Sequence, residues 1–491
     1  MRGNVALLLV LIVVAGCAPS GPSGRGGSVN QPSGGATNRV PKSIALAIRD
    51  DPKNLWESIL GGGMGGSRQL GPILNQYLVV MRADARPEPR LLAELPSLEK
   101  GTWKVLPDGK METLWKLRTD AFWHDQTPLT AEDIVFSIQV NRDPEVPNPY
   151  QAVPRLIEAA EAVGSHTVRV TWSETYPYAD QLEDTQLIPV ARHLVERPYR
   201  EAKDTLLSQP HFSEEWVGLG PYKLVQWVRG SHMELAAFDR FFMGPPKIDS
   251  IRVQFVADQN TMLANLRAGT LHMVLPQGEA DFEEMMLLKR EWEAAGRGTV
   301  IAEASRWVFV EPQKRAMAQP ADLTDLRVRQ ALQHAIDRPE LARAMAGDLG
   351  LAADSWVHPS FPEYPVVERS LVRYPYDVNR AKALMAEAGW AVGSDGVLQK
   401  SGERFDVQVR FRSNTHSRPA AIVRDNWRAL GIQGDLAFLP DTVQQDRAAR
   451  ATFSGVDIAN NPMGGLNAAK RLSSQLIPTA ENRYNGSNRG G

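Results

Sequence analysis

The chain of 491 residues has very little of several things that often reveal a protein's chemistry. It contains one cysteine, Cys17, so no disulfide can form within the chain, and only nine histidines, which disfavours a dedicated transition-metal site. Its 55 basic and 57 acidic residues give a net charge of −2 and form no long blocks of one sign. The sequence therefore gives no reason to expect nucleic acid as a partner.

Common motifs of hydrolases and nucleotide-binding enzymes are also missing. The sequence has no H-E-x-x-H, no G-x-S-x-G and no Walker A motif. Gly61, Gly63 and Gly66 do satisfy G-x-G-x-x-G. However, residues 49–59 separate them from the preceding predicted strand, whereas a dinucleotide site needs that strand directly before the glycines. We therefore interpret these glycines as a pliable loop, which in a functional role would line a ligand entrance. We expect no enzyme activity and no cofactor.

His124 and Asp125 are adjacent and could be imagined as a catalytic dyad. Adjacent residues in an extended segment point to opposite faces, so the carboxylate cannot orient the imidazole as a general base requires. We predict a turn at this position instead. No catalytic or metal-ligating residue is predicted in the chain.

The N-terminus has the pattern of a lipoprotein export signal. Arg2 gives a short basic region, residues 5–14 form a nearly unbroken apolar run, and small residues lead to Cys17. The run is well below the ~20 apolar residues that a membrane-spanning helix needs. We predict that residues 1–16 are a signal peptide and that Cys17 is diacylated, because two acyl chains anchor a protein stably. The alternative is an ordinary secretory signal whose apolar region happens to end at a cysteine.

The next segment predicts a flexible tether rather than a folded region. Residues 17–40 are dominated by Gly, Pro and Ser and have too few apolar side chains to bury. Roughly 450 residues follow, which at ~150 residues per domain correspond to three domains or two large lobes. A substantial hydrophobic core is therefore expected.

The first half of the folded part alternates strands with helices. Residues 103–105 and 111–117 keep a period of two on either side of a Pro- and Gly-containing turn, which predicts a β-hairpin. Residues 225–227 and 233–237 predict a second hairpin around Arg-Gly-Ser. Both pairs are typical of half-buried strands.

Helix signals occur in both halves. Thr130 and Asp133 have the spacing of a capping arrangement before apolar residues at helical intervals. Residues 328–336 place apolar side chains at i, i+3, i+4, i+7 and i+8. Together these signals predict two lobes of α/β character. The other signals are a strand at 251–255, helices after Asp337 and from Asp377 to Gly389, a helix at 423–430 that ends at Gly431, and a strand at 436–438.

The residues around the predicted helix after Thr130 carry a resemblance. Trp123-His124-Asp125 followed by residues 128–137 resembles the signature region of the family 5 extracellular solute-binding proteins, the oligopeptide, dipeptide and nickel receptors of ABC importers. Other segments agree with that family in order, over residues 41–459. These segments are 92–94, 218–222, 266–269, 325–332, 335–338 and 386–390.

The resemblance implies an α/β fold of the periplasmic-binding-protein type (cluster C), a two-lobed clamp with an extra subdomain and a hinge between the lobes. Residues 41–66, 216–276 and 456–491 are then expected in the first lobe. Residues 67–215 are expected to form its added subdomain, and residues 277–455 the second lobe. Similar proteins continue well beyond this C-terminus, so the resemblance also implies a truncated C-terminal part of the first lobe.

The function implied by the resemblance is capture of peptides or a similar small organic solute. Ligand-driven closure of the lobes would then present the solute to a membrane permease. The implied partners are the solute, the permease and ATPase subunits of an ABC importer and, through the lipid on Cys17, the membrane. The chain is expected to be an extracytoplasmic, lipid-anchored monomer. The alternative is a lipid-anchored clamp that binds an oligosaccharide or another solute for sensing rather than transport.

The resemblance leaves the ligand open. In peptide-binding relatives an acid soon after the second hinge crossing pairs with the ligand's amino group. Asp457 resembles the family's strand aspartate, but amides and glycine replace the later acid, which argues against recognition of a free amine. Core packing is the alternative for every tryptophan, and Trp427 on a helical apolar stripe is expected in the core. Candidate ligand contacts are Gly63, Trp307, Trp356, Asn460, Asn461 and Met463.

Overall fold

A computed structural model describes most of the chain from residue 41 onwards. The predicted signal peptide and tether, with Cys17, lie outside the described residues, as do Gly63 and Met463. The described residues are 41–57, 67–82, 86–146, 153–182, 187–275, 282–302, 306–412, 416–444, 446–462, 477–480 and 484. We call residues 41–302 the first lobe, and residues 306–462 with 477–480 the second lobe.

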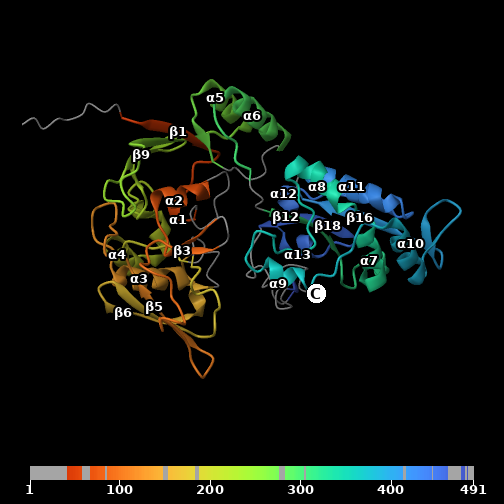
Figure 1. Cartoon of the computed structure of the whole chain (residues 1–491), viewed down its shortest axis with the longest axis horizontal. Coiled ribbons are helices and arrows are strands. Elements are labelled where there is room, and N and C mark those ends of the chain that lie inside the picture. Colours follow the sequence, from red (N-terminus) through yellow and green to blue (C-terminus); the bar gives the residue numbers. More distant parts are fainter. Residues whose placement is uncertain are drawn as a thin grey trace, which may run out of the picture. The chain divides into compact units, whose positions relative to one another are not determined.

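The first lobe is built on a five-stranded sheet, whose strands run from red to green in Figure 1. Strand β1 is parallel to β10 and β11, whereas β8, β9 and β10 pair antiparallel. Both faces of β1 are buried, with Leu46 and Ile48 in one core cluster and Ala47 in another. The spatial order is β11 (Met273–Val274), β1 (Ser43–Ile48), β10 (Ser250–Phe255), β9 (His232–Ala237) and β8 (Tyr222–Val228).

The hairpin of β8 and β9 confirms the two strands predicted here, but one side chain faces a different side from the prediction. The strand register shifts between Leu224 and Gln226, so β8 has one more residue than its partner at this point. The extra residue, Val225, is 62% exposed instead of facing the core. The predicted period of two is therefore wrong at Val225, because a bulge interrupts it, and Leu224 packs against the core instead.

A second, four-stranded antiparallel sheet lies in the same lobe. Its first two strands form the predicted hairpin, with Trp103 opposite Thr113 and Gly109 in the turn at a φ of +84°. Met111 and Trp115 are buried on the inner face. The order is β4 (Trp103–Val105), β5 (Met111–Lys116), β7 (Thr167–Trp172) and β6 (Ile157–Gly164), and a separate two-stranded pair consists of β2 (Val79–Met81) and β3 (Pro87–Pro89).

Helix α3 (Ala131–Arg142) joins the cores of the two sheets. Phe136 and Val140 belong to the core of the first sheet, whereas Ile134 and Ile138 belong to the core of the second. A helix that is buried on both sides cannot be assigned to one sheet alone. The other helices of the lobe are α1 (Leu55–Glu57), α2 (Gly71–Leu74), α4 (Arg192–Glu201), α5 (Gln259–Ala268) and α6 (Phe282–Ala295).

Helix α6 packs on the first lobe, contrary to the predicted boundary at residue 277. Leu288 is 1% exposed and lies in a cluster with Ala47 and residues of α5. Glu291 forms an ion pair with Arg267 of α5, with 3.2 Å between Oε2 and Nε. The expectation that residues 277 onwards belong to the second lobe is therefore wrong for this helix, and the second lobe begins after it.

The second lobe contains a four-stranded sheet. Strand β16 is parallel to β17 and β18, and β12 is antiparallel to β18. Residues 456–462 were expected in the first lobe, and this expectation is wrong, because β18 is an internal strand of the second sheet. Pro478 also contacts this lobe, accepting a hydrogen bond from Arg315. The order is β12 (Arg306–Pro312), β18 (Val456–Pro462), β16 (Asp406–Phe411) and β17 (Gln433–Phe438), and a small sheet consists of β13 (Ala391–Val392), β14 (Leu398–Lys400) and β15 (Glu403–Arg404).

Two helices of the second lobe begin, and two end, where the sequence predicts, whereas the helix predicted at 423–430 already begins at Ser417. Asp337 and Asp377 each accept a hydrogen bond from a backbone N–H in the first turn of their helix, and Gly389 and Gly431 have φ values of +89° and +87° after the last turns. No helix of the described residues has both the length and the apolar character for crossing a bilayer. The helices are α7 (Leu326–His334), α8 (Arg338–Ala346), α9 (Tyr364–Glu368), α10 (Val378–Glu387), α11 (Ser417–Arg428), α12 (Asp441–Gln444) and α13 (Arg447–Ala451).

Candidate ligand-binding face

The two faces of the second sheet have opposite chemistry. One face is apolar, because Val407, Val409 and Ile458 pack with α7, α10 and α11 in the core of the lobe. The alternate residues of the same strands include charged and aromatic side chains. We call this second side the polar face and define it by Trp307, Phe309, Arg410, Arg412 and Asp457. In open α/β sheets, ligands bind beyond the carboxyl ends of parallel strands. Arg412 directly follows the carboxyl end of β16, which pairs with parallel strands on both sides.

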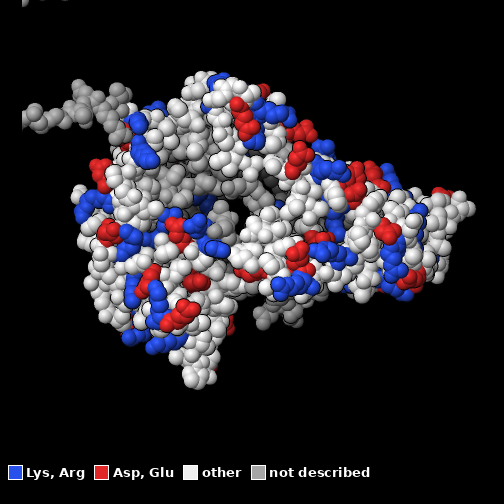
Figure 2. All heavy atoms as spheres, in the orientation of Figure 1, with Lys and Arg blue, Asp and Glu red and all other residues white. Residues whose placement is uncertain are grey.

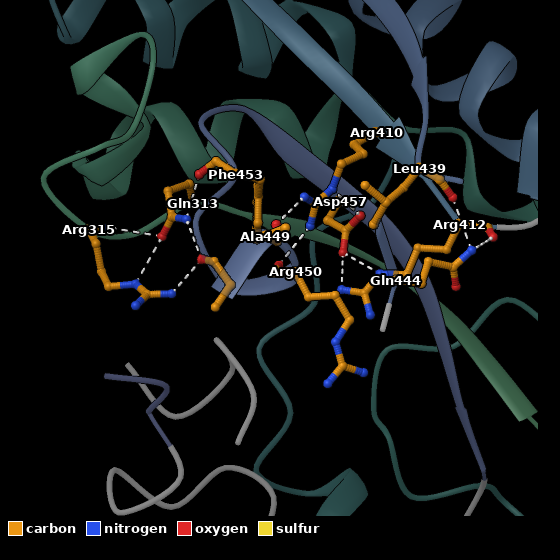
Figure 3. A network of polar contacts seen from close by, with 11 residues as sticks. Gln313, Arg315, Arg410, Arg412, Leu439, Gln444, Ala449, Arg450, Phe453 and Asp457 are labelled. Carbon is orange, nitrogen blue, oxygen red and sulfur yellow. Dashed lines mark hydrogen bonds and ion pairs between the residues drawn. The ribbon is translucent and has the colours of Figure 1, made fainter. Parts of the chain in front are cut away.

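Asp457 is the centre of the polar face (Figure 3). Its side chain is 0% exposed, and its two oxygens bind different arginines. Arg410 Nε donates to Oδ1 at 3.0 Å, and Arg412 Nε donates to Oδ2 at 2.8 Å, with Nη2 of Arg412 contacting the same oxygen. Charge-assisted bonds of this kind compensate the desolvation of a buried carboxylate. Both oxygens are occupied by the protein, so Asp457 has a structural role.

Arginines and a glutamine cap the end of α13 on this face. Arg410 donates to the carbonyl oxygens of Ala449 and Arg450 at 2.9 and 2.8 Å. Arg315 Nη2 and Gln313 Nε2 donate to the carbonyl of Ala451 at 2.7 and 3.3 Å. The last carbonyls of a helix have no intrahelical partner, so these side chains satisfy them. Helix α13 is thereby fixed against the buried ion pair.

The Arg450 side chain differs from its neighbours. In Figure 3 it extends away from Asp457, and no hydrogen bond or ion pair links its guanidinium to any described residue. The side chain is half-buried. Burial, reinforced by the positive charges of Arg412 and Arg447, lowers the pKa of the Arg450 guanidinium. The polar face therefore has more positive charge than its one central carboxylate neutralises.

A second buried acid lies on the same side of the sheet. Glu311 is the register partner of Asp457 and is 6% exposed. It acts electrostatically on Lys314, where burial lowers the pKa of the ammonium group and the carboxylate opposes that shift. The negative charge of Glu311 therefore stabilises the ammonium group of Lys314.

The predicted aromatic contact Trp307 lies on the polar face. Its ring packs against Phe309 with centroids 4.8 Å apart, and both side chains are half-buried. Asn461 is the register partner of Trp307, and Ala459 is that of Phe309. An aromatic pair near a guanidinium cluster can bind the apolar part of a solute while the charged part binds an arginine.

Asn460 lies on the opposite face of the sheet from Trp307, because consecutive strand residues alternate between the faces and Asn461 is the register partner of Trp307. Its Oδ1 accepts a hydrogen bond from Arg306 at 2.7 Å, and its Nδ2 lies 3.0 Å from Nε2 of the buried His416. The predicted contacts Trp307 and Asn460 thus do not form one cluster. Trp356 is half-buried in the segment between α8 and α9.

His124 and Asp125 form the predicted turn and have different partners. His124 is 7% exposed; its Nδ1 accepts from the backbone N–H of Gly218 at 3.1 Å, and Nε2 donates to the carbonyl of Gly220 at 3.0 Å. Burial lowers the pKa of this imidazole to about 4, so the ring is neutral at pH 7. Asp125 instead contacts His193 at 2.6 Å. His124 is a brace for residues 218–220, not a catalytic base.

The polar residues of α3 have a comparable structural role. Asp133, Ser137 and Asn141 are spaced by four residues and lie on one side of the helix. They bind the backbone of residues 188–192: Arg192 N donates to Asp133, Val190 N donates to Ser137, and Asn141 donates to the carbonyl of Ile188 and accepts from its N–H. The predicted capping box is confirmed, with Thr130 N donating to Asp133 at 2.9 Å.

Sequence reasoning missed the arginines of the polar face. A signal for two of them was present, since Arg410 and Arg412 alternate with Val407, Val409 and Phe411 around one strand. Arg450 gave no signal, because its environment comes from segments distant in sequence. Among the described residues, no three His, Cys, Asp or Glu side chains gather where they could hold a metal ion.

Comparison with known proteins shows which families and structures the chain is similar to. The model of the bacterial extracellular solute-binding proteins, family 5 middle, matches residues 95–466. The oligopeptide-binding protein AppA of Bacillus subtilis is 23% identical over 339 residues, which are 66% of this chain and 58% of AppA. The dipeptide-binding protein of Escherichia coli is 26% identical over 353 residues, which are 68% of this chain and 61% of that protein. The matches thus span about three fifths of those two relatives.

Two solved structures support the fold. NikA from Brucella suis, in complex with Fe(III)-EDTA, superimposes with a TM-score of 0.69 at 18% identity, and the alignment covers 90% of this chain and 84% of NikA. NikZ from Campylobacter jejuni, in complex with Ni(L-His), gives a TM-score of 0.66 at 19% identity over 92% of this chain and 84% of NikZ. The two-lobed α/β architecture predicted from the sequence is thereby confirmed.

Proposed function

We propose, since the chain belongs to the bacterial extracellular solute-binding proteins of family 5, that it captures a small organic solute outside the cytoplasm and delivers it to the permease of an ABC importer. The observation that carries the proposal is the family match over residues 95–466, which includes strands or helices of both lobes. Relatives named for binding oligopeptides and dipeptides make a peptide or peptide-like solute the first candidate. The role is binding rather than catalysis.

The proposed mechanism uses the two lobes as a clamp. A solute that contacts both lobes only when they close favours the closed state by its differential affinity for that state. Partner subunits would supply the energy of transport from ATP. A lipid on Cys17 and the tether at residues 17–40 would keep the clamp near its permease and raise its effective concentration there.

Within the second lobe, we assign solute contact to the polar face. The support is the combination of a half-buried aromatic pair, Trp307 with Phe309, and guanidinium groups at the carboxyl end of β16. Trp356, Asn461, Met463 and Gly63 stay proposed contacts on the family resemblance. Asn460 is a weaker choice, since Arg306 and His416 bind its side chain.

Native mass spectrometry of the protein purified from its own cells tests the proposal. We expect a retained solute of low molecular mass that is released when the protein unfolds. The solute, added back to the emptied protein, should raise the melting temperature, because binding stabilises the native state by RT ln(1 + [L]/Kd). Protein that carries no solute and gains no stability from peptides, oligosaccharides or organic acids would contradict a capture function.

A separate experiment tests the anchor. Replacement of Cys17 by serine removes the only thiol in the chain, and the variant should leave the membrane fraction while binding solute as before. Retention of the Cys17→Ser protein in washed membranes would show that the attachment is not a lipid on this residue.

A further inference from the structure

An ion pair between two helices connects the two lobes. Arg418 Nη1 of α11 lies 3.0 Å from Oε1 of Glu283 of α6. Each helix is fixed to its own lobe by buried residues. Leu288 of α6 packs with Ala47 of the first sheet, and Trp427 of α11 packs in the core of the second lobe. The pair therefore joins side chains that belong to different lobes.

Arg418 lies where its charge does not stabilise its own helix. It is in the first turn of α11, and the N-terminal end of a helix favours negative charge. That first turn contains no acidic residue. Glu283, in contrast, lies in the first turn of α6, where an acid is favourable. The stability of α11 therefore gives no reason for a cation at this position, whereas a partner on the other lobe does.

Two other arginines of α11 form ion pairs within the helix. Arg424 Nε donates to Asp425 Oδ1 at 2.9 Å, and Arg428 Nη1 donates to the same oxygen at 3.2 Å. On the face drawn in Figure 2, acidic and basic side chains are intermixed, so that face shows no general attraction between an acidic and a basic lobe. The contact between Glu283 and Arg418 is thus specific to these two side chains.

We propose that Glu283 and Arg418 form a latch that stabilises the arrangement of the lobes in this structure and so biases the hinge of the clamp. This inference rests on the proposed function and adds a means by which the protein sets its solute affinity. The apparent dissociation constant of a clamp varies inversely with the fraction of molecules in the arrangement that binds solute. The side chains of Arg418 and Glu283 are 60% and 80% exposed. The expected bias is therefore about two- to five-fold and is screened by salt.

Spin labels report the arrangement of the lobes on protein from which any solute has been removed. A Cys17→Ser background contains no native thiol, so labels can be attached at Val225→Cys in the first lobe and Val366→Cys in the second. Both positions are exposed. Pulsed electron paramagnetic resonance measures the distance between the labels. Glu283→Arg and Arg418→Glu should each lower the population at the main wild-type distance, relative to other distances, by about two-fold or more.

Exchanged charges and a matched control connect the effect to this pair. The double variant Glu283→Arg/Arg418→Glu restores an ion pair of opposite polarity and should return the distances towards those of the wild type. Arg380→Glu is the control, because Arg380 also lies in the first turn of its helix but pairs within α10, with Glu387 at 3.2 Å. It should leave the distances unchanged. Urea denaturation establishes that each variant is folded, and Arg418→Glu should keep its stability because an acid is favourable at this end of α11.

Each outcome decides the latch without deciding the capture function. Unchanged distances in both single variants, a double variant that stays like the single variants, or an equal shift in Arg380→Glu would overturn the latch. None of these measurements requires a bound solute. The capture function fails only if the purified protein holds no solute and no tested solute class stabilises it.

Discussion

Buried polar side chains occur in both lobes, but they are satisfied in different ways. On α3, Asp133, Ser137 and Asn141 bind backbone groups of residues 188–192, with partners provided within the lobe. On the polar face of the second lobe, Asp457 is equally buried, yet the arginines around it outnumber the acid and Arg450 has no described acceptor. The first arrangement is complete without a ligand, whereas the second has an unused donor.

This difference distinguishes contacts that maintain the fold from contacts that could select a solute. Residues 123–137, which carry the resemblance noted in the sequence, contain His124 and Asp133, which brace neighbouring backbone. Such contacts are needed whatever solute is bound. Under the proposed function, residues that distinguish one solute from another would lie where donors are left unused among the described residues, and local motifs do not specify such places.

Removal of the central acid should have the largest effect. Asp457→Asn leaves Arg410 and Arg412 without their counter-charge in a buried site, which we expect to destabilise the protein by about 3–5 kcal/mol. Urea denaturation followed by circular dichroism measures the change. Asp435→Asn on the exposed side of β17 is the matched control and should change stability by less than about 0.5 kcal/mol. Equal effects of the two changes would show that the buried ion pair contributes nothing specific.

A somewhat smaller loss is expected on α3. Asn141→Ala removes both hydrogen bonds to Ile188 and leaves that backbone buried without partners, at a cost of about 2–4 kcal/mol. The same denaturation experiment applies, with Asn260→Ala on the exposed part of α5 as the control. Solute affinity of the folded Asn141→Ala protein should equal that of the wild type. A loss of affinity without a loss of stability would contradict the assignment of α3 to architecture.

His124 predicts a pH dependence of stability. Burial lowers its pKa to about 4 in the folded state, against about 6.5 when unfolded, so between these values only the unfolded chain binds the proton. The stability from this residue is complete above pH 6.5 and is lost as the pH falls towards 4, by up to about 3 kcal/mol. Melting curves from pH 4 to 8 should show this slope in the wild type and in His166→Gln. They should not show it in His124→Gln, and a persistent slope there would assign it to another group.

Most secondary structure could be predicted because its signals are local. The capping box at Thr130, the turn at Gly109 and the left-handed residues Gly389 and Gly431 act within a few residues of the element that they start or end. The bulge at Val225 could not be predicted, since one extra residue leaves the composition of a strand unchanged.

Lobe membership and the polar face depend on contacts between distant segments. Strand β18 and helix α6 could not be assigned correctly by analogy, because their places follow from pairing with β16 and packing on α5. Trp307 was predicted as a contact from its residue type and from the segment in which it lies, whereas Arg450 acquires its significance only when α13 is placed beside Asp457. An unpaired charge is a property of the assembled structure.

The comparison is sharpest for Arg410 and Arg450, and replacement of Arg450 has the smallest expected effect on stability. Arg410→Met should destabilise the protein by about 3 kcal/mol or more, since it removes a partner of Asp457 and the donor to two carbonyls of α13. Arg450→Met keeps an apolar stem and removes a charge that binds nothing in the described structure, so stability should stay the same or rise by up to about 1 kcal/mol. Paired urea titrations of these variants without solute measure both changes. Because stabilisation with loss of binding is typical of a residue kept for function, a loss of more than about 1 kcal/mol in Arg450→Met would instead make Arg450 another structural arginine.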